Sequence, residues 1–292
     1  MKQIIIALTF FITLFTSATP CHAIKIGVIV ASDQIGVGSS KATSLIDANT
    51  NKTICKIDPM KGYSIIPYKN TMAIRLDGKY YQIYSDNIVL KPANGGYINA
   101  KNKWYRGYLM IQNRGQKLTV INNVTLEDYI KGVVPSEMPS SWEIEALKAQ
   151  AIAARSYALA NLGKRAALGF DLKDTPEDQA YGGASAETSK TNSAVNDTAG
   201  LVLTYNYKVI SAYYSASAGG QTISSKDLWG KDLPYIRSVP SYDDGVKKNG
   251  HGIGMSQHGA NNLAKQGYNA YQILEYFYKN VKFARADENS IR

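Results

Sequence analysis

A single glutamate stands between two prolines in the segment VVPSEMPSSW, residues 133–142. Glu137 follows Pro135 by two positions and precedes Pro139 by two. Each proline fixes its own φ angle and pushes the residue before it out of helical conformation, so the backbone around Glu137 is expected to be rigid. A carboxyl held rigidly among apolar side chains has a raised pKa, which a general acid near neutral pH needs. The alternative is a surface turn with a solvated glutamate, although turns more often carry Gly, Asn or Asp.

A glycine-rich segment, GHGIGMSQHG (residues 250–259), is the second candidate for binding or chemistry. The segment before it does not read as a strand, which argues against a dinucleotide site. A zinc site through its two histidines has no third ligand at a suitable spacing. Glycines let the backbone approach a ligand closely, and the neighbouring polar side chains donate and accept hydrogen bonds. We expect substrate contacts from His251, Ser256, Gln257 and His258, with a plain glycine-rich turn as the alternative.

The segment YYSASAGGQT (residues 213–222) has the same character, because hydroxyl groups are followed by two glycines. Its candidates are Ser215, Ser217 and Gly220. The chain also has 21 tyrosines, whose rings can stack on sugar faces, so the two segments together favour a polysaccharide cleft. Arg155 stands in the middle of a predicted helix among alanines, and it points either into a polar cavity or to bulk water.

Other chemistries have weaker support. Cys55 has no histidine near it, and the serines lack the G-x-S-x-G context of a nucleophile elbow, which argues against acyl transfer. A glycosidase with paired carboxylates needs a second acid that faces the first. Glu143 and Glu145 begin a predicted helix, where the helix dipole favours acidic residues, so neither is an obvious partner for Glu137.

The elements that carry these residues indicate an α+β fold. Residues 24–124 have the pattern of strands, with hairpin turns at Asp77-Gly78 and around Arg114-Gly115. We expect this β-rich part to be followed by helices packed on a mainly antiparallel sheet, with a central substrate cleft. Two further strands are predicted at 201–207 and 209–217.

Four helices are predicted after residue 124, the last of them a closing helix after the glycine-rich segment. Thr125 is the expected N-cap of a short helix that Pro135 ends. A long helix over residues 140–163 has apolar positions three and four residues apart, mostly alanines, so another element should pack closely against it. A further helix over 186–200 ends at a glycine.

The beginning of the chain predicts export. Residues 1–23 have a lysine near the start, an apolar run too short to span a bilayer and a plausible cleavage site after Ala23, with an uncleaved membrane anchor as the alternative. Removing this signal peptide leaves one cysteine and hence no internal disulfide. The formal charge of +10 suits an anionic partner such as a cell-wall polymer. Nucleic acid is disfavoured because the cations are scattered.

Four motifs, LEDYIKGVVPSEMP, ALKAQAIAARSYAL, YYSASAGGQT and GHGIGMSQHGA, occur here in one order. In this the chain resembles the SpoIID/LytB-domain proteins, which are peptidoglycan lytic transglycosylases of sporulation and amidase enhancers. The resemblance is clear from about Tyr105 to Phe283 and fainter from Ile24 onward. It divides the chain into a signal peptide (1–23), a β-rich region (24–97), a SpoIID/LytB-like domain (98–283) and a tail (284–292).

The resemblance implies that Glu137 is the acid and base that cleaves the MurNAc–GlcNAc bond and closes a 1,6-anhydro ring. It also implies that Arg155 binds substrate or supports the acid, and we add Tyr181 to the expected substrate contacts. Peptidoglycan glycan strands are the expected partner, and no cofactor is expected. The alternative is a non-catalytic wall-binding protein that activates an N-acetylmuramoyl-L-alanine amidase.

One segment departs from the family. Some clostridial relatives hold zinc in a C-D-T-T-H-C-Q-V-Y-G stretch, whereas this chain has KDTPEDQAYG at residues 173–182. Lys173, Glu177 and Asp178 occupy the positions of the two cysteines and the histidine. We therefore predict no zinc in this segment.

Overall fold

The computed structural model describes residues 23–93 and 95–286. The expected signal peptide lies outside the described residues except for Ala23, the residue before the predicted cleavage point. Within the described ranges, no helix combines the length and the apolar character that crossing a membrane requires.

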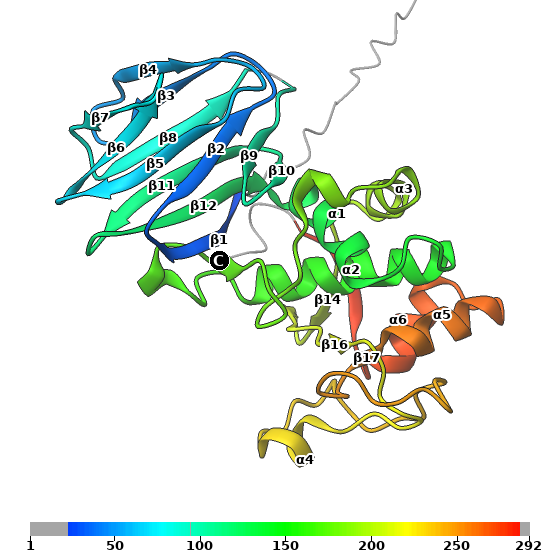
Figure 1. The fold of residues 1–292 in the computed structure, drawn as a ribbon. Helices are drawn as coiled ribbons and strands as arrows, with labels where there is room; N and C mark the ends of the chain where they lie inside the picture. The colour runs from blue at the N-terminus through cyan, green and yellow to red at the C-terminus, as the bar shows by residue number, and fades with distance from the viewer. Residues whose placement is uncertain (1–22, 94, 287–292) are drawn as a thin grey trace, which may run out of the picture.

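The first part of the chain forms two β-sheets that lie face to face (Figure 1). One sheet has the strand order β13-β1-β12-β11-β8-β3-β4, and the other has the order β10-β9-β2-β5-β6-β7. All neighbours are antiparallel except β1 and β13. The strands before the first helix are β1 (Ala23–Ser32), β2 (Ile35–Ser39), β3 (Thr43–Asp47), β4 (Thr53–Ile57), β5 (Tyr63–Tyr68), β6 (Thr71–Leu76), β7 (Lys79–Ile83), β8 (Asn87–Pro92), β9 (Ile98–Ala100), β10 (Lys103–Tyr105), β11 (Tyr108–Arg114) and β12 (Lys117–Thr125).

Alternating side chains explain how the two sheets share one core. Along β2, Ile35 and Val37 are buried while Gly36 between them is exposed. The hairpin at Asp77-Gly78 is confirmed, since Leu76 pairs with Lys79 and both turn residues have positive φ. The second hairpin lies one residue later than expected, because Arg114 still pairs with Lys117.

Helices fill the second part of the chain, and α2 runs through its centre (Figure 1). Helices α1, α3, α5 and α6 and strand β14 all contact α2. Six of its seven alanines are fully buried and allow this close approach. The helices are α1 (Leu126–Glu137), α2 (Ile144–Ala160), α3 (Ser189–Asp197), α4 (Ser225–Trp229), α5 (Gln257–Lys265) and α6 (Ala270–Phe277), with 3₁₀ turns at Ala166–Leu168 and Gly183–Ala186.

Short strands complete this part. Strands β14, β15 and β18 form an antiparallel sheet with β14 in the middle, whereas β16 and β17 form a parallel pair. The fold is therefore α+β, as predicted. The strands are β13 (Leu172–Lys173), β14 (Leu201–Tyr205), β15 (Lys208–Val209), β16 (Tyr214–Ser215), β17 (Met255–Ser256) and β18 (Lys282–Arg285).

Several boundaries differ from the predictions. The strand expected at 209–217 is replaced by the short strands β15 and β16, and the helix expected at 186–200 is α3, which begins only at Ser189. Pro135 does not end α1, which continues to Glu137. Helix α2 begins only at Ile144, after Glu143, and no side-chain cap bond is formed there. The two sheets continue to Thr125, so the expected boundary between residues 97 and 98 falls inside them. Thr125 is confirmed as the N-cap of α1, since its side chain accepts a hydrogen bond from the amide of Asp128.

Candidate functional site

A pocket of about 540 Å³ opens beside the C-terminal end of α1. It brings together the end of α1, the segment before and within β16, the start of α5 and part of the glycine-rich segment. Its wall consists of Glu137, Tyr157, Lys164, Pro176, Glu177, Asp178, Tyr213, Tyr214, Ser215, Ala216, Trp229, Asn249, Gly250, His251 and Gln257. Of the predicted site residues, Glu137, Ser215, His251 and Gln257 thus share one cavity.

Glu137 is a half-buried acid of this wall and lies at the last position of α1. One of its carboxylate oxygens accepts a hydrogen bond of 2.7 Å from the backbone amide of Ala180. Burial raises the pKa of Glu137, and the hydrogen bonds from Ala180, Gln257 and Tyr214 offset only part of that effect. The carboxyl therefore stays protonated to a higher pH than an ordinary glutamate, and it has donors ready to stabilise its ionised form.

The backbone around Glu137 is held at several points. Glu137 is the last residue of α1, and the next amide, that of Met138, donates to the carbonyl of Val134 at 2.9 Å. The Ser136 hydroxyl donates to the carbonyl of Gly132 at 2.8 Å. Gly132 also accepts from the amide of Gly182 at 3.1 Å, which fixes the segment that supplies the Ala180 amide.

The neighbouring ring of Tyr181 explains why residue 132 is glycine. A Cβ at Gly132 would overlap the ring of Tyr181. Tyr181 is buried there and donates its hydroxyl to Asn122 at 2.8 Å. It therefore packs the Ala180 segment against α1 and does not line the pocket, so its predicted contact with substrate is replaced by a supporting role.

The parallel strands β16 and β17 position the other two hydrogen-bond donors to Glu137, which are Tyr214 and Gln257. Tyr214 lies opposite Met255, and Ser215 lies opposite Ser256. Tyr214 therefore reaches the pocket from β16, and Gln257 reaches it from the first position of α5, directly after β17. Burial raises the pKa of Tyr214 strongly, and the charge of Glu137 adds to this, so the phenol keeps its proton.

A buried relay fixes the orientation of Tyr214. The side-chain amide of Gln179 donates to the Tyr214 hydroxyl at 2.8 Å, and its carbonyl accepts from Tyr129 at 3.2 Å. Sequence reasoning named neither Tyr214 nor Gln179. The one available signal was the position of Tyr214 next to Ser215 in a segment already selected for its hydroxyl groups.

Aromatic rings form the outer wall of the pocket. The ring of Tyr213 meets Trp229 edge-on at 4.8 Å and His251 at 6.1 Å between centroids. Trp229 remains 44% exposed, so its ring is accessible to a ligand. Burial lowers the pKa of His251, and its Nδ1 accepts from the amide of Ile253, which leaves a neutral imidazole with Nε2–H as a donor. Such a wall suits a sugar ring.

Asp243 joins the two glycine-containing segments behind the pocket. This fully buried carboxylate accepts from the amides of Ala218 at 2.6 Å and Gly220 at 2.7 Å. It also accepts from the hydroxyls of Ser241 and Ser256. Burial alone would raise the pKa of Asp243, but these four hydrogen bonds together lower it, so the group is an anion.

Ser256 connects the carboxylate of Asp243 to the start of α5, where Gln257 lies. Its hydroxyl donates to Asp243 at 2.6 Å and accepts from the amide of Gly259 at 3.1 Å as the N-cap of α5. Gln257 is the first residue of that helix. Gly220 and Ser256 were predicted to contact substrate, but the structure makes them part of the support that places Gln257.

Two more predicted residues belong to the scaffold. The hydroxyl of Ser217 donates to the carbonyl of Lys247 at 2.7 Å. The ring of His258 meets Trp142 edge-on at 4.8 Å, and its amide donates to the carbonyl of Ala216. Neither residue lines the pocket, so both hold its loops and helices in place.

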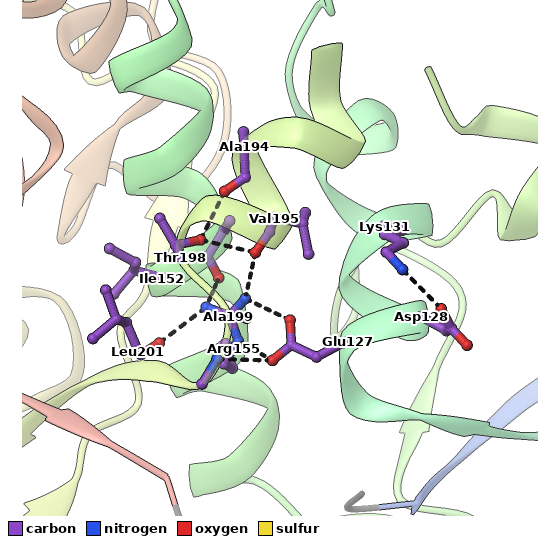
Figure 2. Close-up of polar contacts among 12 residues, drawn as sticks. Glu127, Asp128, Lys131, Ile152, Arg155, Ala194, Val195, Thr198, Ala199 and Leu201 are labelled. Carbon is purple, nitrogen blue, oxygen red and sulfur yellow. Dashed lines mark hydrogen bonds and ion pairs between the residues drawn. The ribbon is translucent and has the colours of Figure 1, made fainter. Parts of the chain in front are cut away.

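Arg155 lies outside the pocket wall and is completely buried. Figure 2 shows its hydrogen bonds to Glu127 and to nearby backbone carbonyls. Its Nε and Nη2 atoms both donate to the carboxylate of Glu127 at 2.8 Å. The remaining N–H groups bond to backbone carbonyls of Ala151, Val195 and Leu201. All five donors of the guanidinium are thus used within the protein, which corrects the expectation that Arg155 contacts substrate. Its role is to join α1, α2 and β14.

Ion pairs hold the segment that departs from the family pattern. Asp178, whose side chain is fully buried, pairs with Lys164 at 2.6 Å and Arg165 at 3.1 Å. Glu177 pairs with Lys173 at 2.8 Å. In the part of the chain that the structure describes, no three His, Cys, Asp or Glu side chains are grouped to hold a metal ion.

Comparisons with known proteins agree with the motifs. Residues 114–205 match the family model for SpoIID, described as stage II sporulation protein. An uncharacterized protein of Brachyspira hyodysenteriae is 34% identical over 68% of this chain and 50% of its own length.

Two named Bacillus subtilis proteins also match. The amidase enhancer is 47% identical over 37% of this chain and 14% of its own length. Stage II sporulation protein D is 28% identical over 57% of this chain and 76% of its own length. The chain thus spans half or less of the first two relatives.

Proposed function

This chain carries a domain of the SpoIID/LytB family, and on that premise we propose that it is a peptidoglycan lytic transglycosylase with Glu137 as general acid and base. A function at the bacterial cell wall is what the family relation supports. The observation that carries the specific proposal is the shielded carboxyl of Glu137, with its raised pKa, in the wall of an aromatic-lined pocket.

The reaction needs only one carboxyl. Protonated Glu137 gives its proton to the oxygen that joins MurNAc C1 to GlcNAc O4, and the C1–O4 bond breaks. The carboxylate then takes the proton of the MurNAc C6 hydroxyl as O6 bonds to C1. The products are a 1,6-anhydroMurNAc end and a free GlcNAc 4-hydroxyl, and no water is consumed.

The neighbours of Glu137 fit both steps. Burial favours the protonated acid before the bond breaks. The Ala180 amide, Gln257 and Tyr214 stabilise the carboxylate that forms next. Glu177 and Asp178, the other acids in the wall, are already in ion pairs with basic side chains, which leaves Glu137 as the group for proton transfer.

The direct test is digestion of purified glycan strands, with and without stem peptides, by the wild type and by Glu137→Gln. Mass spectrometry should find anhydro-muramic ends, which are lighter by one water than hydrolysed ends, only with the wild type. Glu143→Gln is the matched control, because Glu143 precedes α2 and does not line the pocket. Equal yields of anhydro ends from the wild type and Glu137→Gln would refute the role of Glu137.

A second candidate function is activation of an N-acetylmuramoyl-L-alanine amidase without catalysis. It is favoured by the 47% identity to a protein named amidase enhancer, although the match covers 14% of that protein. The same digestion separates the two functions. Intact glycan under every condition, together with faster stem-peptide release when an amidase is added, would establish the activator.

Export is part of the proposal. The lysine, apolar run and cleavage motif of residues 1–23 are the features that support it. Fractionation of cells, with mass spectrometry of the N-terminus, should find a product beginning at Ile24 outside the cytoplasm.

A further inference from the structure

A second hollow, of about 270 Å³, lies on the outer face of the six-stranded sheet. We call it the β2 trough, because two of its residues are glycines of β2. Its wall consists of Gly36, Val37, Gly38, Ser39, Met60, Lys61, Gly62, Asn99, Asn102 and Trp104. None of these residues lines the Glu137 pocket.

Missing side chains create the floor of the trough. Ile35 and Val37 enter the core, so the residues between and after them, Gly36 and Gly38, belong to the opposite face. Lys61 closely approaches Gly38, which explains that glycine. A Cβ at Gly36 would meet no atom within 4 Å, and its φ is not positive. The fold therefore does not require glycine at position 36, although glycine weakens a strand.

Gly62 is a second glycine of this kind. A Cβ there would also meet nothing within 4 Å, and its φ is not in the positive range. Glycine inside a strand or at a strand edge often marks a place where a ligand approaches the backbone. Two such glycines in one hollow point to an occupant that lies directly on the backbone.

Polar and aromatic groups stand beside this floor in register. Gly38 pairs with Asn99, and Asn99 pairs with Trp104, so the three residues form a row across β2, β9 and β10. Trp104 and Asn99 are half-buried, and Asn102 is exposed. Among the residues that the structure describes, no hydrogen bond to the side chains of Asn99, Asn102 or Trp104 is found. Two amides and an indole N–H are therefore available to a ligand.

The rim adds an apolar contact and no free charge. Met60 is 72% exposed, and its backbone has a φ of +58°. Its amide donates to the carbonyl of Ser39 at 2.8 Å, which fixes this unusual conformation. Lys61 lies between Asp58 at 3.7 Å and Asp77 at 3.6 Å, so its charge is balanced. A neutral ligand with an apolar face fits these surroundings better than an anionic one.

We propose that the β2 trough binds a sugar unit of a β-1,4-linked N-acetylhexosamine chain, away from the Glu137 pocket. The indole of Trp104 stacks on the sugar face, the amides of Asn99 and Asn102 bond its hydroxyl and N-acetyl groups, and the glycines admit the ring. The identity of the polymer rests on the proposed function. The trough is also joined to the catalytic part, because the amide of Trp104 donates to Ser185 at 2.8 Å, in the turn that contacts α1.

Gly36→Val is the sharpest test, because it fills the floor without disturbing the fold. In the Glu137→Gln background, which prevents cleavage, this change should weaken retention on purified peptidoglycan and binding of N-acetylchitohexaose about tenfold. The melting temperature should stay the same or rise, since valine suits a strand better than glycine. Tyr84→Ala is the matched control, because Tyr84 is 85% exposed and lies outside both hollows. Normal retention by Gly36→Val would overturn the proposal.

Tryptophan fluorescence gives an independent readout. The chain has three tryptophans, of which Trp104 lines the trough, Trp229 lines the Glu137 pocket and Trp142 lines neither. In a Trp229→Phe variant, addition of N-acetylchitohexaose should still change the emission. A further Trp104→Phe change should abolish that response. Two results together would overturn the proposal in favour of an anionic ligand. The emission of Trp229→Phe would not change with N-acetylchitohexaose, and the protein would no longer be retained on peptidoglycan once anionic polymers are stripped from the wall.

The two proposals fail separately. If anhydro ends depend on Glu137 but Gly36→Val binds normally, the trough proposal is wrong and the lytic function stands. If no anhydro ends form but Gly36→Val loses wall retention, the lytic function is wrong and the trough remains a glycan-binding site.

Discussion

The carboxylate of Glu127 receives two parallel hydrogen bonds of 2.8 Å from the fully buried guanidinium of Arg155. Glu127 lies in the first turn of α1 and Glu137 is its last residue, so this ion pair anchors the opposite end of the helix that carries the acid. The same carboxylate accepts a hydrogen bond of 3.0 Å from the amide of Gly200, so it also holds the start of β14 against α1.

Neutralising Glu127 should destabilise the protein strongly. Glu127→Gln leaves the Arg155 cation buried without a counter-charge, and breaking such a pair costs about 3–5 kcal/mol of unfolding free energy. Urea denaturation measures this loss. Asp128→Asn is the matched control, because the adjacent pair of Asp128 with Lys131 is partly exposed (Figure 2) and contributes about 1 kcal/mol or less. Equal losses of unfolding free energy in the two variants would show that the buried ion pair contributes no more to stability than the partly exposed one.

Replacing the acid itself should stabilise the fold. Burial raises the pKa of Glu137, so its ionised form is disfavoured in the folded state. Wild-type stability therefore falls as pH rises from the ordinary glutamate pKa, about 4.3, through the higher pKa of the folded state, whereas Glu137→Gln has no such loss. Melting temperatures of the two proteins should agree near pH 4 and diverge above it, with the variant higher. A lower melting temperature for the variant at neutral pH would contradict the raised pKa.

Removing one donor should shift the pH profile of cleavage. The first step needs protonated Glu137, so the rate falls on the alkaline side as that group ionises. The hydrogen bond from Tyr214 lowers the pKa of Glu137, so Tyr214→Phe should move the alkaline limb of kcat/KM to higher pH. The carboxylate loses a donor as well, so the maximal rate should fall. Tyr157→Phe is the control, because it changes another tyrosine of the wall and should leave the alkaline limb where it is. If the limb shifted in both variants, the shift would reflect a general change of the pocket and not the loss of the Tyr214 hydrogen bond.

Asp243 should be essential for the shape of the site. Asp243→Asn replaces an acceptor of four hydrogen bonds by a group that presents N–H atoms to some of the donors, and we expect a loss of about 2 kcal/mol or more in unfolding free energy. Activity should fall further than the folded fraction, because Ser256 no longer places Gln257. Asp244→Asn, at the exposed neighbouring position, should change neither quantity. Full activity of Asp243→Asn at a temperature where it is folded would refute the positioning role.

The features that could be predicted from sequence depend on local chemistry. Thr125 caps α1 through an amide three residues away, and the turn at Asp77-Gly78 needs only its own backbone angles. The proline frame of Glu137 is equally local. Pro135 misled the prediction of the helix end because hydrogen bonds around it, including that from Met138 to Val134, keep the last turn helical.

The missed features depend on partners far along the chain. The acceptors of Arg155 include Glu127, 28 residues before it, and Leu201, 46 residues after it, so nothing near Arg155 reveals that it is satisfied. Tyr214 reaches Glu137 because a two-residue strand pairs with another 41 positions later. Strands this short have no periodicity to detect.

Strand β1 imposes an order on folding. It lies between β12, about a hundred residues later, and β13, where Ile26 faces Leu172. The strand cannot take its place until both neighbours have been synthesised, so more than half of the chain must be present before the larger sheet closes. Contacts over such distances slow folding, because loop closure must precede any gain from pairing. A fragment that begins after β1 would leave β12 as an open edge, which makes aggregation, rather than loss of one catalytic group, its expected failure.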